Sequence, residues 1–362
     1  MSGALRDRLM GSGAVYGTVG GTEVVRHYGD PGAEYRAVRE AAGFAQRSDR
    51  ARIRMWGRDP RRMLNGLITN DLALLAPDRA VYAAMLTPKG RVISDLRAFP
   101  LDEGELGVDL PLDALPAVSA HLTKYVPPLF ARWEAVETAS VVGVYGPRSP
   151  ELLEGVIGVV ADPEEDRLTR GMIDGAGVLA IGTRYAGGET GYDLLVDATS
   201  LPTLWDALVR VGADLTARPV GFDVLETLRI EAGEPRFGSE ISEEVLPAEV
   251  FAPTRMERAV SFSKGCYTGQ EVVVRIAHRG HVNRHLRGLL LGDAPAPTDR
   301  IALLNPEGGK EVGWTTSGTV SPLVRQTIAL GFVRREIAPG QEVVLGEPSG
   351  PRAQVVELPF RG

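Results

Sequence analysis

Two pairs of similar segments recur along this chain at nearly the same offset. MWGRDPRRMLNGL from Met55 resembles VYGPRSPELLEGV from Val144, and each is typical of a strand end, a glycine turn and an apolar helix. LGVDLPLDALPAVSAHL from Leu106 resembles LLVDATSLPTLWDAL from Leu194, and each is typical of a strand that ends in Val-Asp, followed by a loop and a helix. The offsets, 89 and 88 residues, predict two related α+β parts, with the repeat at residues 55–122 and 144–208. The alternative is coincidence between two common patterns.

The pattern changes after residue 285. Short apolar segments follow one another at close spacing with glycine and proline turns between them, which is typical of a small all-β barrel or sandwich. We therefore expect an α+β region at 1–290 and a C-terminal β-barrel at 291–362. Within the first region, apolar runs flank Thr87-Pro88-Lys89-Gly90, and this pattern predicts a β-hairpin turn.

Composition excludes several classes of protein. The single cysteine allows no intrachain disulfide and supplies too few thiolates for a four-cysteine iron–sulfur or zinc site. The N-terminal residues lack the apolar run of a signal peptide, and no segment has the length of a membrane span. The net charge of −7 argues against a chain that coats nucleic acid. We therefore expect a cytoplasmic monomer that has no resident metal and does not contact nucleic acid or membrane directly.

The one cysteine lies in the polar octapeptide KGCYTGQE, residues 264–271. A free cysteine usually packs as a small hydrophobe, and from composition alone that is the better expectation for Cys266. The apolar neighbours of a packing role are missing here, while Lys264 lies two residues away and a nearby cation favours the reactive thiolate. Gly265 and Gly269 permit an unusual backbone. The octapeptide as a whole therefore favours an accessible, reactive thiol.

Two aspartates and one basic stretch are candidates for ligand binding. Asp95 and Asp193 lie where strands are expected, and a carboxylate accepts two parallel hydrogen bonds from a heterocycle with adjacent N–H donors. The alternative for each is a carboxylate at a turn or strand edge. Residues 275–287 combine four arginines with three histidines, which suits an anion such as a phosphate or a polyglutamate tail better than a metal. A solvated basic strand or hairpin is the alternative.

The octapeptide, followed by Arg275, resembles the signature of the YgfZ-type folate-binding proteins, which are relatives of the aminomethyltransferase (T-protein) of the glycine cleavage system. LNGLITNDL from Leu64, LRIEAGEPRFGSEI from Leu228 and WTTSGTVSP from Trp314 resemble the same superfamily, so the resemblance covers nearly the whole chain. It implies an aminomethyltransferase-like fold of class α+β, with two related α+β parts around a folate channel and a C-terminal β-barrel.

The resemblance also implies a ligand, tetrahydrofolate or a one-carbon derivative of it. It places Asp95 near the reacting folate nitrogen and makes Asp193 the anchor of the pterin ring. The residues that it assigns to catalysis are Cys266, Lys264 and Asp95, and those that it assigns to folate binding are Asp95, Asp193, Tyr267, Gln270, Glu271 and Arg275.

One departure separates the chain from glycine cleavage enzymes. Where those enzymes have Ala-Arg-Asp before their LRLEAG stretch, this chain has Val224, Leu225 and Glu226, and those enzymes lack the octapeptide. Both differences favour the YgfZ branch, whose members support the assembly or repair of iron–sulfur clusters and thereby affect tRNA modification. Iron–sulfur client or assembly proteins are then the expected partners. The alternatives are a tetrahydrofolate-dependent aminomethyltransferase and a non-catalytic, folate-gated scaffold.

Overall fold

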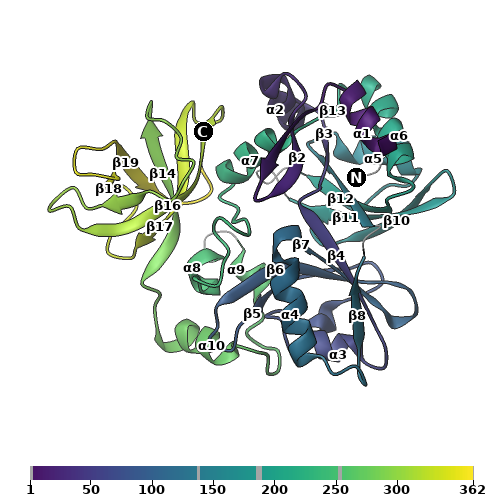
Figure 1. Ribbon diagram of the computed structural model, residues 1–362, viewed down its shortest axis with the longest axis horizontal. Coiled ribbons are helices and arrows are strands. Elements are labelled where there is room, and N and C mark those ends of the chain that lie inside the picture. Colours follow the sequence, from purple (N-terminus) through teal and green to yellow (C-terminus); the bar gives the residue numbers. More distant parts are fainter. Residues whose placement is uncertain (1–2, 137–138, 185–189, 252–254, 362) are drawn as a thin grey trace. The chain divides into compact units, whose positions relative to one another are not determined.

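The computed structural model describes residues 3–136, 139–184, 190–251 and 255–361 (Figure 1). Its chain divides into two compact units that interleave in sequence. Unit 1 consists of Met1–Leu64, Leu72–Tyr82 and Leu96–Leu225, and unit 2 consists of Asn65–Asp71, Ala83–Asp95 and Glu226–Gly362. Among the described residues, no helix combines the length and apolar character needed to cross a membrane.

Unit 1 contains a six-stranded sheet with the order β10-β11-β12-β9-β3-β13. Its strands pair antiparallel except β13, which runs parallel to β3. Their bounds are β3 (Gly43–Gln46), β9 (Ala139–Tyr145), β10 (Leu168–Ile173), β11 (Ala176–Thr183), β12 (Gly191–Asp197) and β13 (Arg218–Pro219).

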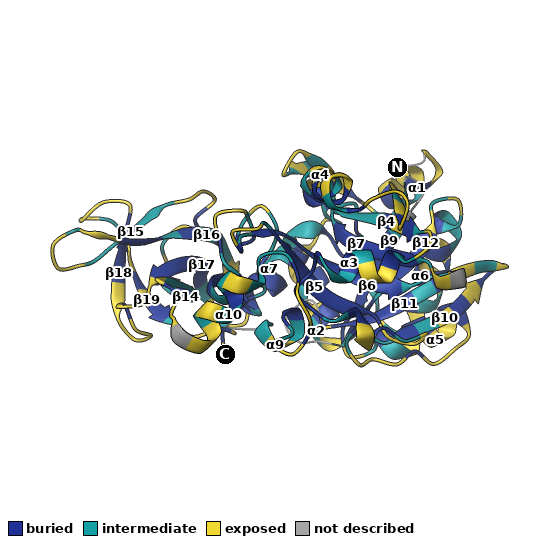
Figure 2. Ribbon diagram, turned by 90° about the horizontal axis from the view of Figure 1, so that it is seen from below, coloured by how far each residue is buried: buried dark blue, intermediate teal, exposed yellow. Residues whose placement is uncertain are grey.

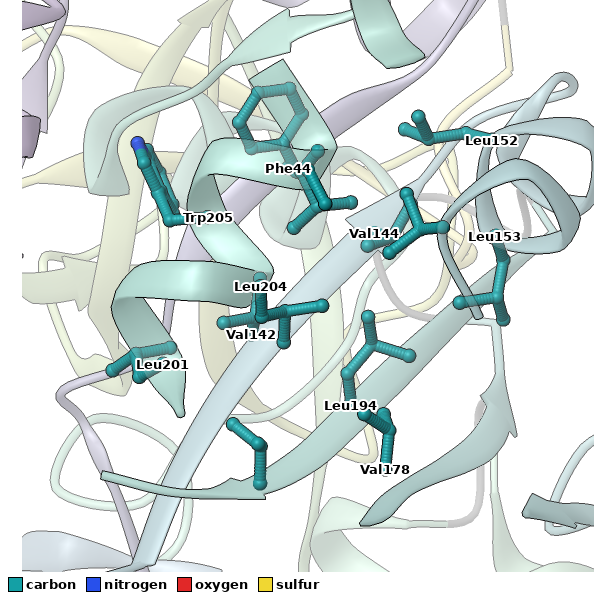
Figure 3. Packing of buried hydrophobic residues seen from close by; sticks show 14 of the residues in the cluster. Phe44, Val142, Val144, Leu152, Leu153, Val178, Leu194, Leu201, Leu204 and Trp205 are labelled. Atoms are coloured by element: carbon teal, nitrogen blue, oxygen red, sulfur yellow. The ribbon is translucent and has the colours of Figure 1, made fainter. Parts of the chain in front are cut away.

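Helices cover one face of this sheet and form the largest part of its core. The helices are α1 (Gly3–Gly11), α5 (Ser149–Ile157) and α6 (Leu201–Asp214). Figure 3 shows Leu201, Leu204 and Trp205 of α6 beside Val142 and Phe44 from the sheet. Leu201, Leu204, Trp205 and Leu208 recur at helical spacing, so one side of α6 is apolar and is buried against the strands.

A five-stranded sheet has the order β5-β6-β7-β4-β8. Its strands are β4 (Arg50–Trp56), β5 (Val81–Leu86), β6 (Val92–Pro100), β7 (Leu106–Pro111) and β8 (Arg132–Ala135), and its helices are α3 (Pro60–Asn65) and α4 (Leu115–Tyr125). The order β5-β6-β7-β4 repeats the order β10-β11-β12-β9, and α3 and α4 follow β4 and β7 as α5 and α6 follow β9 and β12. The prediction of two related α+β parts is therefore confirmed.

The remaining elements of unit 1 are short. They are the hairpin β1 (Val15–Val19) and β2 (Thr22–His27), the helix α2 (Pro31–Glu40), and the single turns η1 (Leu72–Leu74), η2 (Asp102–Gly104) and η3 (Leu112–Ala114). The Asp30 side chain caps α2 by accepting a hydrogen bond from the amide of Ala33, and proline occupies the first helical position.

Unit 2 contains a closed β-barrel with the order β14-β17-β16-β15-β18-β19, which confirms the expected C-terminal barrel. The strands are β14 (Arg284–Gly292), β15 (Ala302–Leu304), β16 (Glu311–Ser321), β17 (Gln326–Arg334), β18 (Glu342–Leu345) and β19 (Arg352–Val356). Figure 2 shows β17 largely buried, whereas the loops that join barrel strands are exposed. β14 begins at Arg284, six residues before the boundary placed at residue 290.

The helices that the structure describes between residue 222 and the barrel are α7 (Phe222–Glu231), which starts in unit 1, α8 (Pro247–Val250), α9 (Met256–Ala259) and α10 (Gln270–Arg279). The predicted turn at residues 87–90 joins β5 to β6, with the Gly90 amide bonded to the Thr87 carbonyl at 2.9 Å. Gly269, the N-cap residue just before α10, has a φ of +82°, and an added Cβ there would lie 2.6 Å from the Thr87 carbonyl oxygen. Only glycine meets both requirements without strain.

Candidate functional site

Seven polar side chains of unit 1, from the six-stranded and five-stranded sheets and the segment after β3, form a continuous and largely buried network, called here the Arg97 cluster. Its members are Arg47, Asp49, Arg50, Arg97, Asp109, Tyr145 and Asp193. Strand alternation explains why Asp193 reaches it. Tyr192 and Leu194 belong to the helix-covered core, so Asp193 between them lies on the opposite face of β12.

Asp193 receives one protein hydrogen bond on each carboxylate oxygen. Arg97 Nη2 donates to Oδ2 at 2.7 Å, and the Tyr145 hydroxyl donates to Oδ1 at 2.9 Å. The Asp193 side chain is 13% exposed, whereas those of Arg97 and Asp109 are 5% and 2% exposed. Of the two carboxylates that bind Arg97, Asp193 is therefore the more exposed and the more open to a ligand.

The network continues on both sides of Asp193. Arg97 Nη2 also donates to Asp109 Oδ2 at 3.3 Å, and Arg50 binds both oxygens of Asp109. Arg47 donates to the Tyr145 hydroxyl at 2.8 Å and to both oxygens of Asp49. Three arginines thus face three carboxylates, so the buried charges are paired, as burial in a medium of low dielectric requires.

Electrostatics keep Asp193 ionised. Burial by itself raises the pKa of the Asp193 carboxyl, but the positive charges of Arg97, Arg47 and Arg50, together with the Arg97 hydrogen bond, outweigh burial and leave this pKa below its usual value. Asp49 behaves similarly, because Arg47 and Arg50 outweigh burial and lower the pKa of its carboxyl to about 2.

In unit 2, Lys264 of the octapeptide is buried and holds the loop Asn65–Asp71 in place through hydrogen bonds. Its Nζ donates to the carbonyls of Asn65, Ile68 and Asn70 at 2.7, 2.9 and 2.7 Å, and to Asn65 Oδ1 at 3.1 Å. Burial lowers the pKa of Lys264 to about 8, with the charge of Asp71 acting in the opposite direction. The sequence predicted a lysine that activates the thiol, whereas the structure gives its ammonium a positioning role in the fold.

Cys266 is exposed, as the polar neighbours predicted. It lies in an irregular segment that leads into α10. Tyr267 is buried beside it, and its hydroxyl has no hydrogen-bond partner among the residues that the structure describes. Burial raises the pKa of Tyr267 to about 12, and Lys264 Nζ lies 5.1 Å from the centre of its ring.

The other residues assigned to the ligand lie on α10. Gln270 is the first residue of this helix, and Glu271 and Arg275 are exposed on it. Residues 275–287, for which a strand or hairpin was one expectation, are therefore a helix end followed by β14. Helical spacing of Val273 with the half-buried Ile276 explains the difference, since one apolar side of the helix is buried while Arg275 and His278 remain in solvent.

Asp95 lies in unit 2, on the buried strand β6, and its own exposed fraction is 7%. Within the described residues, no group of three or more histidine, cysteine, aspartate or glutamate side chains has the arrangement of a metal site.

The sequence missed most of the Arg97 cluster. Two signals could have found it: Arg97 is a charged residue inside the apolar strand VISDLRAF, and Asp109 is a charged residue inside the strand LGVDLP. A charge in a strand that is otherwise fully buried requires a partner, and that requirement predicts a buried ion pair. Nothing in the sequence identifies Tyr145 or Asp193 as that partner, because the pairing depends on how the two sheets face one another.

Two family models match the chain. The GCVT N-terminal domain matches residues 5–264, and the glycine cleavage T-protein C-terminal barrel domain matches residues 284–361. The chain therefore belongs to the glycine cleavage T-protein family.

Its relatives and a solved structure agree with this assignment. The aminomethyltransferase of Frankia alni is 32% identical over 362 residues, covering 98% of this chain and 96% of the relative. That of Moorella thermoacetica is 31% identical over 333 residues, covering 90% and 88%. The crystal structure of glycine cleavage system aminomethyltransferase T from Bartonella henselae matches with a TM-score of 0.84 at 21% identity, over 99% of this chain and 97% of that one, and so supports the fold.

Tetrahydrofolate is the cofactor of this family, as the resemblance implied. One observation within unit 1 fits it. Each oxygen of Asp193 keeps a lone pair after its protein hydrogen bond, so the carboxylate can accept the two adjacent N–H donors of a pterin.

Proposed function

We propose that this protein binds tetrahydrofolate and transfers a one-carbon unit in the manner of an aminomethyltransferase. The observation that carries the proposal is the family match along nearly the whole chain, including relatives named aminomethyltransferase. The partly exposed, ionised Asp193 supports it as the anchor of the pterin ring. Asp95 is the second acidic residue of the proposal, assigned to the reacting folate nitrogen.

Two measurements test this function. Calorimetry with 5-formyltetrahydrofolate, a stable reduced folate, should show saturable binding to the full chain. Transfer of the aminomethyl group from a loaded lipoyl carrier protein to tetrahydrofolate should then be measurable and should be lost in Asp95→Asn. Binding without any transfer would limit the protein to folate recognition, and absence of binding would overturn the proposal.

A second function is favoured by the octapeptide. Cys266 is exposed while Lys264, two residues earlier, fixes the preceding segment against Asn65–Asp71. This combination presents a thiol from a fixed loop, which suits the YgfZ-type role of supporting iron–sulfur clusters in client enzymes. The tRNA modification that depends on such enzymes would follow indirectly.

Complementation separates this second function from a scaffold role. In a strain that lacks the protein, Cys266→Ser should fold normally yet fail to restore the activity of iron–sulfur enzymes. Exposed Ser263→Ala, in the same loop, is the matched control and should restore it. Full restoration by Cys266→Ser at equal expression would exclude the thiol and leave a folate-gated scaffold or the aminomethyltransferase alone.

The basic residues around α10 complete the proposal. Arg275 and His278 are exposed on this helix and are suited to a polyglutamate tail. Polyglutamylated folate should therefore bind more tightly than the monoglutamate at low salt, and the difference should shrink as salt is added. Equal affinities at low salt would exclude this role.

A further inference from the structure

The Arg97 cluster contains two side chains next to Asp193 that the family resemblance did not assign. We infer that Arg97 and Tyr145 are positioning residues, which hold the Asp193 carboxylate charged and in one orientation so that its two remaining lone pairs receive the adjacent N–H donors of a pterin. The inference rests on the proposed function, because it takes Asp193 as the residue that binds the pterin.

The orientation of Asp193 is fixed from both ends. Its backbone lies in a central strand, paired with Ile181 of β11 and with Gly143 of β9. One donor on each carboxylate oxygen means that any rotation of the carboxylate breaks a buried hydrogen bond. The plane in which its free lone pairs lie is therefore set before a ligand arrives, which reduces the entropy lost on binding.

Tyr145 is itself held in place. A Cβ at Gly143 would lie 2.1 Å from the Tyr145 hydroxyl, and a Cβ at Gly191 would lie 2.6 Å from its ring, so both glycines make room for this side chain. Arg47 Nη1 donates to the hydroxyl oxygen at 2.8 Å. An arginine can only donate, so the proton of the Tyr145 hydroxyl is directed to Asp193.

Charges from several segments of unit 1 act on Asp193. Arg97 comes from β6, Arg50 from β4 and Arg47 from the residue after β3, while Asp109 of β7 is a carboxylate that shares Arg97 with Asp193. Arg97 is the cation in direct contact, and its Nη2 bridges Asp193 and Asp109. Removing its charge would leave two carboxylates facing each other, and protonation of one would relieve the repulsion.

The test is calorimetry of 5-formyltetrahydrofolate between pH 4 and pH 8 with the full chain. Tyr145→Phe should weaken binding by about three- to tenfold, the effect of one buried hydrogen bond. Arg97→Gln should weaken it by more than about tenfold and shift the acid limb of the affinity profile upward by about one pH unit or more. Arg97→Lys, which keeps the charge, should restore the pH profile while recovering only part of the affinity.

Tyr192→Phe is the matched control. It removes another buried tyrosine hydroxyl hydrogen bond, to the Ala161 carbonyl, from the neighbouring position on the other face of β12. It should lower thermal stability to a similar degree as Tyr145→Phe without changing folate affinity. Should Arg97→Gln fail to fold, Tyr145→Phe and Arg97→Lys still decide the question.

The outcomes are distinguishable. If the wild type binds and Tyr145→Phe and the Arg97 variants keep its affinity and its pH profile, the positioning role is wrong and the proposed function stands. Equal losses in Tyr145→Phe and Tyr192→Phe would also overturn it, because they would reflect general destabilisation. If the wild type binds no reduced folate, the proposed function fails and this inference fails with it.

Discussion

Each unit of the molecule buries an arginine among carboxylates, and the two arrangements differ in how completely they are closed. In unit 2, Arg229 donates to both oxygens of Glu226, to Glu240 at 2.9 Å and to the Ser317 hydroxyl at 2.8 Å. The side chains of Arg229 and Glu240 are 1% and 0% exposed. In unit 1, the Arg97 side chain is 5% exposed, and its partner Asp193 keeps 13% of its side chain exposed.

The difference separates a structural cluster from a candidate binding site. Glu240 accepts a hydrogen bond from the Ser317 hydroxyl on Oε1, and from Arg229 and the Arg236 amide on Oε2. These bonds join the barrel strand β16 to the segment around residue 240 and leave Glu240 little hydrogen-bond acceptor capacity for a ligand. Asp193 receives a single donor on each oxygen. A buried ion pair alone is weak support for function, whereas one with unused acceptor capacity and an exposed edge suits a ligand with N–H donors.

The largest expected effect is on the closed cluster. Arg229→Met removes the cation and leaves Glu240 buried without its charge partner, which typically costs about 3–5 kcal/mol of unfolding free energy. Urea unfolding of the full chain measures it. Arg352→Met, which breaks an exposed ion pair with Glu342 on the same barrel, is the control and should stay within about 0.5 kcal/mol of the wild type. A loss of unfolding free energy below about 1 kcal/mol for Arg229→Met would contradict the claim that this cluster depends on a fully buried charge pair.

The sequence predicted the fold better than it predicted these two clusters of buried polar side chains. The repeated strand–turn–helix pattern gave both related parts, because each carries its own apolar periodicity and glycine turn. The pattern of short strands after residue 285 correctly predicted the barrel. By contrast, α10 was missed as a helix because the alternation of histidine and arginine concealed an apolar side of few residues, Val273 and Ile276. The exposure of Cys266 followed from its neighbours, but the partners of Lys264 lie some 200 positions away in the sequence, where local patterns carry no information.

A second closed site, the four-oxygen cage around Lys264, should show the next largest effect. Lys264→Met leaves the carbonyl oxygens of Asn65, Ile68 and Asn70 without their donor and should cost about 2–3 kcal/mol of unfolding free energy. Exposed Lys310→Met is the control and should change it by less than about 0.5 kcal/mol. Equal stability of the two variants would show that the cage does not hold the loop.

A substitution at Asp193, in the more open Arg97 cluster, should change the affinity for folate rather than the fold. Asp193→Ala removes the acceptor of the pterin donors and should weaken binding of 5-formyltetrahydrofolate by about ten- to a hundredfold. Calorimetry measures this change, and circular dichroism shows whether the variant is folded. An unchanged affinity would exclude Asp193 as the anchor of the pterin, and the Arg97 cluster would then be a structural cluster like that of Arg229.

The smallest expected effect is at the edge of the Arg97 cluster and depends on pH. The pKa of Asp49 is about 2 in the folded protein because Arg47 and Arg50 favour its ionised form, against 3.8 for an ordinary aspartate. Since the folded-state pKa is the lower one, the unfolded chain binds more protons, so the stability from this ionisation is fully present above about pH 4 and is lost as the pH falls toward 2. The Asp49 side chain is 29% exposed, so solvent screening reduces the contribution to about 1 kcal/mol.

Urea unfolding of the wild type and of Asp49→Asn measures this contribution. The difference between their unfolding free energies should have this size at pH 7 and should become progressively smaller below pH 4. A gap that stays constant down to pH 3 would mean that the Arg47–Asp49 pair acts through its hydrogen bonds and shape rather than its charge, and the cluster would then resemble the closed one of unit 2 more than the two exposures suggest.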